Sequence, residues 1–403
     1  MSNLPSERIA VVDVLRAFAL LGIIITHSEM GFLAGPPPGQ DFMQFSALDI
    51  SVHRWVGILV SSKFFSIFSF LFGLSFAIQL SNAAQKGTAF AGRFAWRLVV
   101  LFLIGMAHHL LFNGDILMIY AALGLLLIPL GKVRSGALLV VALLLLLNVP
   151  GLVQGIARIN APPPTPEQQQ ANARMGELFI VGGKALYTAA KSGSFADIAA
   201  ANLSYGLEMK WTYQLITGRL WITFGCFLLG LCAGRANLFR ESDASRRLFT
   251  RLLIGAGTVA LLSTVLKVAY SAPSPLTAAL MQFATGVQDA SLAATYVAAI
   301  TLMYWKHSRG VLSQLAPLGK MGLTTYLLQS VFLAVVFFEV GFGMMGEIGS
   351  AMAVALGTAL FVAQAFMARW WVRRFSMGPV EWLWRSVTYF RWQPTATHAP
   401  RDG

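Results

Sequence analysis

Long apolar segments separated by short polar connections dominate the chain. A segment of about 20 apolar residues is long enough to cross a bilayer as an α-helix. Ten such segments lie near residues 10–33, 56–80, 95–112, 115–131, 135–155, 212–234, 248–270, 279–304, 322–341 and 349–372. The pattern therefore predicts an all-α, polytopic integral membrane protein with ten transmembrane helices, of which the third and fourth form a tight hairpin.

Basic residues occur in every second connection between these segments. They are Arg8 before the first segment, then Lys86, Arg93 and Arg97, Lys132 and Arg134, Arg235, Arg240, Arg246, Arg247 and Arg251, Lys306, Arg309 and Lys320, and finally Arg373, Arg374, Arg385 and Arg391. The short connections 271–278 and 342–348 contain no Lys or Arg. Because basic loops tend to stay in the cytoplasm, this alternation predicts that both termini are cytoplasmic.

One long connection, residues 156–211, divides the chain. It opens with Ala161-Pro-Pro-Pro-Thr-Pro166 and a glutamine run, which predict an extended connector outside the cytoplasm. Residues 175–191 and 195–209 are typical of amphipathic or interfacial helices. We therefore expect an N-terminal bundle of five helices (1–155), this connector (156–211), and a C-terminal bundle of five helices with a basic tail (212–403).

Composition supports the membrane class and limits the function. Hydrophobic residues make up 56% of the 403 residues and charged residues only 12%, against about 25% charged residues in soluble globular proteins. The net charge of +13 is explained by the basic cytoplasmic loops, so nucleic-acid binding is not expected. Cys226 and Cys232 lie on different faces of one apolar segment, which favours buried packing over a disulfide or metal site.

Most histidines map to the outer side of the N-terminal bundle. The polar residues predicted there are His27, Glu29, His53, Lys63, His108, His109 and Asp115. A histidine beside a carboxylate is typical of a general base, because its pKa lies near neutral pH and the carboxylate fixes its tautomer. An ionisable residue in a membrane span is costly, so each is a candidate functional residue.

Structural interpretations compete with the catalytic one. His53 could be an interfacial residue beside Trp55, and His27 could pack between helices through a hydrogen bond. Of the adjacent His108 and His109, at most one is expected to face the bundle interior, with a structural role for either. No metal is expected, since no ligand pair has the i, i+4 spacing of a helical zinc site.

The inner side carries a second polar group. Asp13 and Arg16 are three residues apart on one helix face and are expected to pair. Arg93 and Arg97 form a basic face at the start of the third helix. Either they anchor the protein to anionic lipid headgroups, or they bind the phosphates of a cytosolic cofactor.

Several motifs resemble a known family. Asp13-Val-Leu-Arg16, Gly105-Met-Ala-His108 with Gly114-Asp115, and residues 323–330 and 378–385 resemble the YeiB-like bacterial membrane proteins and their C-terminal domain of unknown function. The resemblance covers nearly the whole chain. It implies a multi-pass protein of the bacterial cytoplasmic (inner) membrane.

Two further resemblances concern activity. Trp55-Val-Gly57 with residues 64–73 is similar to the second-helix signature of heparan-alpha-glucosaminide N-acetyltransferase and its relatives, although Ser62 and Ser66 replace an aspartate and a proline. In those transmembrane acetyltransferases a histidine just before the tryptophan is catalytic, which implies this role for His53. Asp13-Val-Leu-Arg16 followed by His27 resembles bacterial membrane O-acyltransferases and implies a role in transfer for His27.

These resemblances imply a membrane acyltransferase. Acyl-CoA, with acetyl-CoA as the expected donor, would bind from the cytoplasm with its phosphates near Arg16, Arg93 and Arg97. His53 or His27 would act on a hydroxyl or amine of a sugar or lipid acceptor outside the cytoplasm. Further expected members of the site are Glu29 and Asp115 as orienting carboxylates, Lys63 as an oxyanion partner or a partner of these carboxylates, and His109 as a neighbour.

Other functions and partners stay open at this point. A proton-coupled transporter or exporter would use the same ionisable residues as a proton relay. A non-catalytic membrane scaffold would dock partners on residues 156–211. Membrane lipid is the expected surrounding partner, and a homodimer is a further alternative. The scarcity of titratable residues in the C-terminal spans favours the enzyme over a transporter.

Overall fold

Helices are the only regular secondary structure in the part of the chain that the structure describes. The computed structural model describes residues 9–159, 161–269, 275–307 and 310–395, where it contains no β-strand. Of the basic residues used to predict the orientation, Arg8 and Arg309 lie outside these ranges. The helices of the first half are α1 (Ala10–Glu29), α2 (Ala47–Leu59), α3 (Lys63–Gln85), α4 (Ala91–Leu111), α5 (Leu117–Leu130), α6 (Ser135–Leu146) and α7 (Val149–Ile159).

The remaining helices complete the fold. They are α8 (Pro166–Ser192), α9 (Phe195–Ala201), the π-helical turn η1 (Asn202–Gly206), α10 (Leu207–Ile216), α11 (Arg219–Arg235), α12 (Asp243–Ala269), α13 (Pro275–Lys306), the 3-10 turn η2 (Val311–Leu315), α14 (Ala316–Lys320), α15 (Gly322–Phe337), α16 (Ser350–Val372) and α17 (Pro379–Tyr389). Every predicted span overlaps at least one of these helices.

Length and apolar composition make this a membrane protein. Five helical segments of the described chain are long and apolar enough to cross a bilayer, namely α1, α2 with α3, α4, α12 and α16. Three bent pairs raise the number to eight if each pair forms one span: α6 with α7, α9 and α10 with α11, and α14 with α15, bent by 49°, 69° and 85°.

Three predicted spans are interrupted rather than continuous. The breaks lie at Ser62 between α2 and α3, at Asn148 between α6 and α7, and at Gly218 between α10 and α11. All three residues have positive φ angles, of 72°, 48° and 72°. A break frees backbone carbonyls that lipid cannot satisfy, so protein groups must bind them. At the first break, Lys63 Nζ donates to the carbonyl of Gly57, 3.2 Å away.

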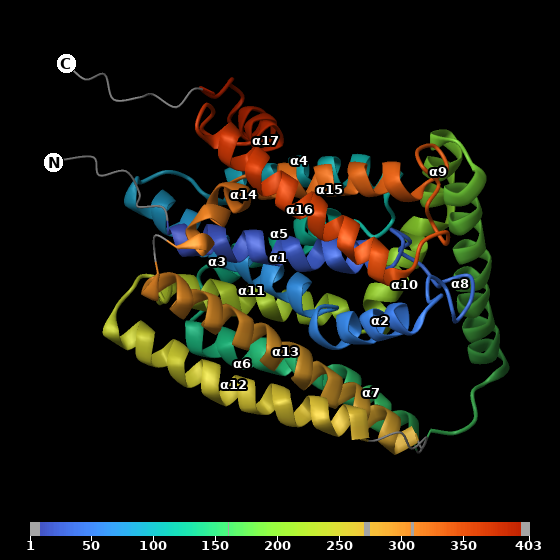
Figure 1. Ribbon diagram of the computed structural model, residues 1–403. Coiled ribbons are helices and arrows are strands. Elements are labelled where there is room, and N and C mark those ends of the chain that lie inside the picture. The colour runs from blue at the N-terminus through green and yellow to red at the C-terminus, as the bar shows by residue number, and fades with distance from the viewer. Residues whose placement is uncertain (1–8, 160, 270–274, 308–309, 396–403) are drawn as a thin grey trace.

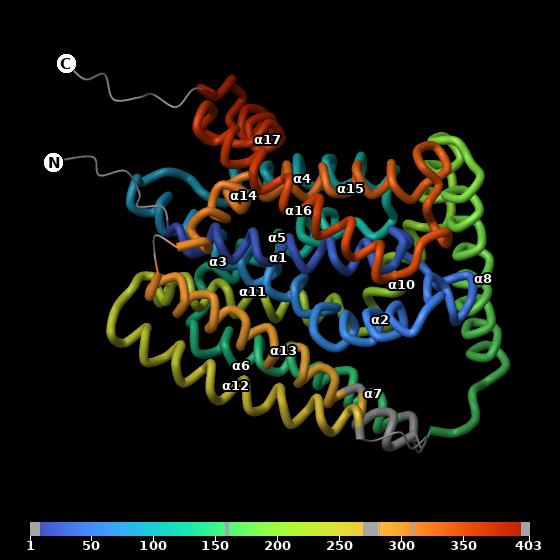
Figure 2. The backbone as a smooth tube through the Cα atoms, viewed as in Figure 1, coloured from blue at the N-terminus to red at the C-terminus, as the bar shows by residue number. Residues whose placement is uncertain are grey.

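The helices lie roughly side by side, with α8 standing across their ends (Figure 1). The described ends of the chain lie near α17, on the opposite side of the molecule from α8, as Figure 2 also shows. Helices of the two halves pack on one another: α1 contacts α3, α14 and α16, and α3 crosses α11. The hairpin of α12 and α13 forms one edge of the molecule. The division of the chain into two bundles stays a prediction.

The segment 156–211 is more helical than the sequence suggested. The glutamine run belongs to α8 and not to the connector, since α8 already begins at Pro166. Thr165 and Gln168 form a reciprocal capping box, and Pro166 occupies the first helical turn, where its missing N–H costs nothing. The sequence Thr165-Pro-Glu-Gln168 thus starts a helix directly after the short proline run.

Candidate functional site

A cavity of about 420 Å³ lies at the C-terminal end of α1, and we call it the His27 cavity. His27 stands in the last turn of α1. The other polar side chains that line the cavity are Thr26, Asn113, Lys210, Tyr213, Gln214, Arg219 and Tyr326. They come from α1, the α4–α5 turn, α10, α11 and α15. The cavity therefore joins residues from both halves of the chain around one imidazole.

Aromatic rings hold the wall beside His27. The centroid of the Phe112 ring lies 4.9 Å from that of His27, and Phe32 stacks on Phe112 at 4.2 Å. The neighbouring Asn113 fixes the turn because its side-chain amide donates to the carbonyl of Ala34 at 2.5 Å. This apolar packing shields His27 from bulk water on one side while its other side faces the cavity.

A buried histidine–carboxylate pair lies next to this wall. His108 Nδ1 donates to Asp115 Oδ1 at 2.8 Å, and the second carboxylate oxygen accepts from the Met118 backbone at 3.1 Å. These partners place the proton on Nδ1. His108 Nε2 is buried and has no hydrogen-bond partner among the described residues. The ring of Tyr326 lies 5.1 Å from that of His108.

Both adjacent histidines are buried, and they face different neighbours on the two sides of α4. His108 is 7% exposed and His109 is fully buried. His109 Nε2 donates to the carbonyl of Asn202 at 3.0 Å, and its Nδ1 accepts from Lys210 Nζ at 3.1 Å. The reason is that α9 and η1 pack against the outer face of α4. Opposite faces of α4 are therefore both covered.

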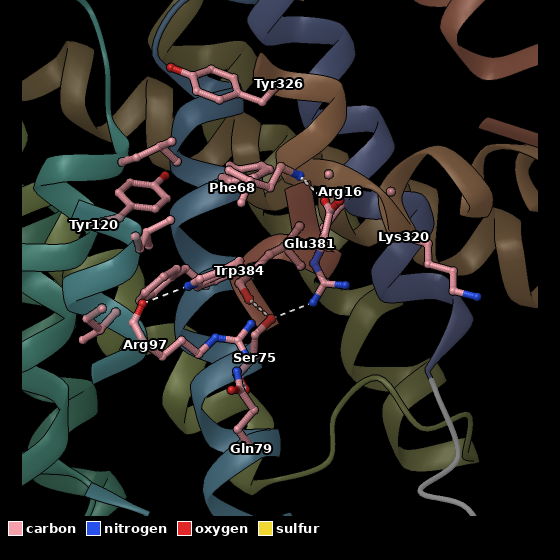
Figure 3. A pocket seen from close by; sticks show the side chains of 18 of the residues that line it. Arg16, Phe68, Ser75, Gln79, Arg97, Tyr120, Lys320, Tyr326, Glu381 and Trp384 are labelled. Atoms are coloured by element: carbon pink, nitrogen blue, oxygen red, sulfur yellow. Dashed lines mark hydrogen bonds between the residues drawn. The ribbon is translucent and has the colours of Figure 1, made fainter. Parts of the chain in front are cut away.

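A second cavity of about 260 Å³ lies beside the N-terminal half of α1, and we call it the Arg97 cavity (Figure 3). Its polar lining includes Arg16, Ser75, Gln79, Arg97, Lys320 and Glu381. Arg16 and Arg97 reach into the space beside Ser75 from opposite sides. Arg16 donates to Ser75 Oγ at 2.6 Å. It also pairs with Asp13, which confirms that prediction.

The helix α17 forms part of this cavity. The indole of Trp384 donates to the carbonyl of Arg97 at 2.9 Å, and the guanidinium of Arg97 lies 3.9 Å from the centroid of that indole. Glu381 accepts from the backbone amides of Leu323 and Thr324 at 2.7 and 3.1 Å. This carboxylate caps the N-terminus of α15, where a negative charge is favourable, and so fixes α17 to the bundle.

Tyr326 connects the two cavities. Its side chain is 4% exposed and lines both of them. It extends from the second turn of α15, directly beyond the helix start that Glu381 caps. A basic cavity and a histidine cavity thus meet at one phenol in the interior of the molecule.

Four predicted site residues lie away from this junction: His53, Glu29, Lys63 and Arg93. The His53 side chain is 53% exposed, and its Nδ1 donates to Glu29 Oε1 at 2.5 Å. Lys63 is buried and pairs at 2.8 Å with Asp289 of α13, rather than with Glu29 or Asp115. The guanidinium of Arg93 lies 5.5 Å from the ring centroid of Tyr389, outside the lining of either cavity.

Residue patterns had not singled out several members of the junction. Tyr326, Lys320, Trp384, Lys210 and Arg219 come from distant segments, and only folding brings them together. Tyr326 and Trp384 do lie in two of the family-like motifs, which is the signal that could have found them. The described residues contain no cluster of three or more His, Cys, Asp or Glu side chains that could hold a metal ion.

Comparisons with known proteins identify relatives over the full length. Residues 233–391 match the family model described as a protein of unknown function (DUF418). The uncharacterized protein YxaH of Bacillus subtilis is 31% identical over 98% of this chain and 97% of its own. A 39.9 kDa protein from the amylase 3′ region of Bacillus acidopullulyticus is 27% identical over 96% and 95%. YeiB of Escherichia coli is 25% identical over 95% and 96%. No solved structure matches the chain.

Proposed function

The chain belongs to the YeiB-like family, and we propose that it is a membrane acyltransferase acting between a cytosolic acyl-CoA and an acceptor outside the cytoplasm. The observation that carries the proposal is the meeting of two cavities at Tyr326. One cavity offers cations for a phosphorylated donor, and the other offers an imidazole for the acceptor. Such an arrangement lets one reaction draw its substrates from opposite sides of a membrane.

The proposed topology has ten spans, with both termini in the cytoplasm of a bacterial inner-membrane protein. The alternation of basic connections supports it. The positions of the cavities are consistent with it, because Arg97 and Lys320 stand near predicted cytoplasmic loops and His27 stands near the predicted outer end of α1. The Arg97 cavity would then open toward the cytoplasm.

The donor would bind in the Arg97 cavity. Arg16, Arg97 and Lys320 supply positive charge for the phosphates of acyl-CoA, whose recognition favours the fork-like guanidinium group. Trp384 holds Arg97 by its stacking contact and its indole hydrogen bond. Arg93 does not line the cavity, so we assign its expected role in phosphate binding to Lys320. The thioester would extend from these cations toward Tyr326.

His27 would act as the general base. It would accept the proton of the acceptor hydroxyl or amine as the nucleophile attacks the thioester carbonyl. The carbon–sulfur bond then breaks, and the proton passes to the thiolate of CoA. Tyr326, the residue that lines both cavities, would donate a hydrogen bond from its hydroxyl to the developing oxyanion. The His108 ring, held by Asp115, would pack against the Tyr326 ring and keep it in place.

The first prediction separates the two candidate histidines. His27→Ala should lower acyl transfer by about a hundredfold or more, the usual contribution of a general base. His53→Ala should leave transfer within a few-fold of wild type, because His53 lies outside both cavities. The assay uses purified protein in vesicles with radiolabelled acetyl-CoA and a mixture of sugar and lipid acceptors.

The control is binding of CoA. His27→Ala should bind CoA as wild type does, whereas Arg97→Gln should bind it more weakly. Full transfer by His27→Ala would remove this histidine from the mechanism. Failure of the wild type both to transfer and to bind CoA would overturn the acyltransferase proposal.

A proton-coupled transporter is the second candidate, and the broken helices favour it. Transporters often bind substrate where helices are interrupted within the membrane. Three of the interruptions in this chain lie at Ser62, Asn148 and Gly218. A transporter would move solute into sealed vesicles in response to a pH gradient without consuming acyl-CoA, and the vesicle assay can measure this directly.

A further inference from the structure

We infer that a third cavity binds an anionic glycerophospholipid and presents its headgroup to His27 as the acyl acceptor. The inference rests on the proposed acyl transfer for the role of the lipid, but not for its binding. This apolar cavity measures about 740 Å³, within the range of about 300–1,000 Å³ common for ligand pockets. It lies between the α12–α13 hairpin and the helices α3, α6 and α11.

The cavity runs along the length of α11. It is lined by Arg219 at the N-terminus of that helix and by Phe239 beyond its C-terminus. The 17 residues of α11 rise about 25 Å at 1.5 Å per residue. Apolar residues form most of the wall, among them Phe70, Leu146, Phe249 and Val297. A long apolar space of this kind fits an acyl chain better than a compact solute.

Three helix breaks meet in the wall of this cavity. Ser62, Asn148, Thr217 and Arg219 all line it. The breaks at Asn148 and Gly218 touch, because a Cβ at Gly218 would lie 2.6 Å from Asn148 Oδ1. The helices α3, α7 and α11 all begin at these breaks. Their positive dipole ends favour an anion there.

The side chains of Arg219 and Asn148 both indicate a lipid headgroup as the ligand. Arg219 Nη1 donates to the hydroxyl of Tyr213 at 3.2 Å, and its guanidinium lies 4.3 Å from the ring centroid of Phe65. Within the described chain no carboxylate pairs with Arg219, whereas the nearby Asp289 is paired with Lys63. Asn148 is 5% exposed, and its side-chain oxygen has no hydrogen-bond partner among the described residues. An anionic phosphate would satisfy Arg219, and one hydroxyl of a diol headgroup would satisfy Asn148 while its second hydroxyl extends toward His27.

The same residues connect the apolar cavity to the His27 cavity. Phe65, Tyr213 and Arg219 line both. A phosphate bound at Arg219 would therefore stand at the boundary, with its acyl chains in the apolar cavity and its alcohol headgroup in the His27 cavity. The headgroup hydroxyl would lose its proton to His27 and form an ester with the acyl group, while CoA leaves as the thiol.

Binding is tested first, without any need for activity. Wild-type protein in detergent is mixed with phosphatidylglycerol or phosphatidylcholine, and bound lipid is counted by native mass spectrometry. Gly286→Phe should fill the cavity, since a Cβ there meets only the Leu146 carbonyl oxygen, 4.0 Å away. Its phosphatidylglycerol binding should fall about tenfold. Gly136→Phe is the matched control, because it adds the same side chain where nothing lies within 4 Å, outside this cavity.

Arg219→Gln tests the headgroup separately from the tail. It should abolish the preference for phosphatidylglycerol over phosphatidylcholine, a loss of about tenfold for a charge-assisted hydrogen bond. Equal phosphatidylglycerol binding by wild type, Gly286→Phe and Arg219→Gln, each with an unchanged melting temperature, would overturn the inference.

The role of the lipid is then tested by transfer. Radiolabelled acetyl-CoA is supplied to vesicles of phosphatidylglycerol, to vesicles of phosphatidylcholine, and to phosphatidylcholine vesicles with soluble glycerol phosphate. Labelled phosphatidylglycerol that disappears in Gly286→Phe supports the inference. Transfer to glycerol phosphate that is unaffected by Gly286→Phe overturns the lipid acceptor and leaves the acyltransferase intact. Lipid binding that depends on Arg219 and Gly286 without any transfer overturns the proposed function and the acceptor role of the lipid, and leaves the lipid-binding site intact.

Discussion

Two histidine–carboxylate pairs in this chain differ in their surroundings. His108 and Asp115 are buried, and the carboxylate also accepts a backbone amide. His53 and Glu29 lie closer together, yet the imidazole is half exposed. Water can replace a lost partner at the second pair but not at the first. Proximity alone therefore does not identify the pair that matters for the fold and the site.

The second prediction follows from this contrast. Asp115→Ala leaves the buried His108 and the Met118 amide without an acceptor, and each unpaired donor costs about 1–3 kcal/mol. The variant should melt well below wild type in detergent, whereas His53→Ala should melt near it. Asp115→Asn, which keeps one acceptor oxygen, should fall between them. Equal melting temperatures for Asp115→Ala and His53→Ala would show that burial does not determine how much each pair contributes to stability.

At the level of elements, two glycines bring α3 and α11 into backbone contact. A Cβ at Gly73 would lie 2.0 Å from the carbonyl oxygen of Phe227, and one at Gly230 would lie 2.0 Å from that of Phe70. Small residues of this kind allow membrane helices to approach closely. This crossing also sets the wall that separates the Arg97 cavity from the apolar cavity, since Phe70 lines the latter and Phe72 the former.

The third prediction uses alanine as the smallest probe of this contact. Gly230→Ala should force the helices apart and lower the free energy of unfolding by about 1–3 kcal/mol. Gly92→Ala in α4 is the matched control, because nothing lies within 4 Å of its Cβ position. Alanine raises helix propensity at either position, so a loss of stability confined to Gly230→Ala isolates the clash. A Gly230→Ala protein as stable as the Gly92→Ala protein would contradict the close crossing.

Helix existence could be predicted from sequence, whereas helix interruption could not. Apolar windows report burial in lipid, and each predicted span overlaps a helix. The breaks at Ser62 and Asn148 depend on distant partners: the hydroxyl of Tyr296, for example, binds the carbonyl of Leu59 at 2.9 Å across the first break. No local motif contains that information. The breaks therefore become visible only in the folded chain.

The same limit applies to the candidate site. His27, Arg16 and Arg97 were predicted from local motifs and charge, and all three line a cavity. Asp289 pairs with Lys63 in place of Glu29 or Asp115, the carboxylates of one alternative, and it lies on a helix more than two hundred residues later. The role of Tyr326 arises from two cavities rather than from its neighbours in sequence. Local patterns thus indicated chemistry, and long-range packing decided which residues share a site.

At the scale of the whole molecule, the two ends of its long axis differ in structure. At one end, Trp96 at the start of α4 stacks on Phe390 at 5.5 Å, and its indole donates to the carbonyl of Val387. The α3–α4 loop and the end of α17 are therefore on the same side. At the other end, α8 covers the helix termini (Figure 1). We therefore expect these two ends to lie on opposite faces of the membrane.

The last prediction assigns those faces. Thr88 lies in the α3–α4 loop, Arg391 follows α17, and Gln170 lies on α8, and all three are exposed. In a background without Cys226 and Cys232, a cysteine at Gln170 should react with a membrane-impermeant maleimide in intact spheroplasts. A cysteine at Thr88 or Arg391 should react only after the membrane is permeabilised, because basic connections stay in the cytoplasm. Labelling of Thr88→Cys and Arg391→Cys on different sides would break the even number of spans, and labelling of both from outside would reverse the orientation. In the reversed case the Arg97 cavity would face away from cytosolic acyl-CoA, so this measurement also decides whether the proposed donor can reach its site.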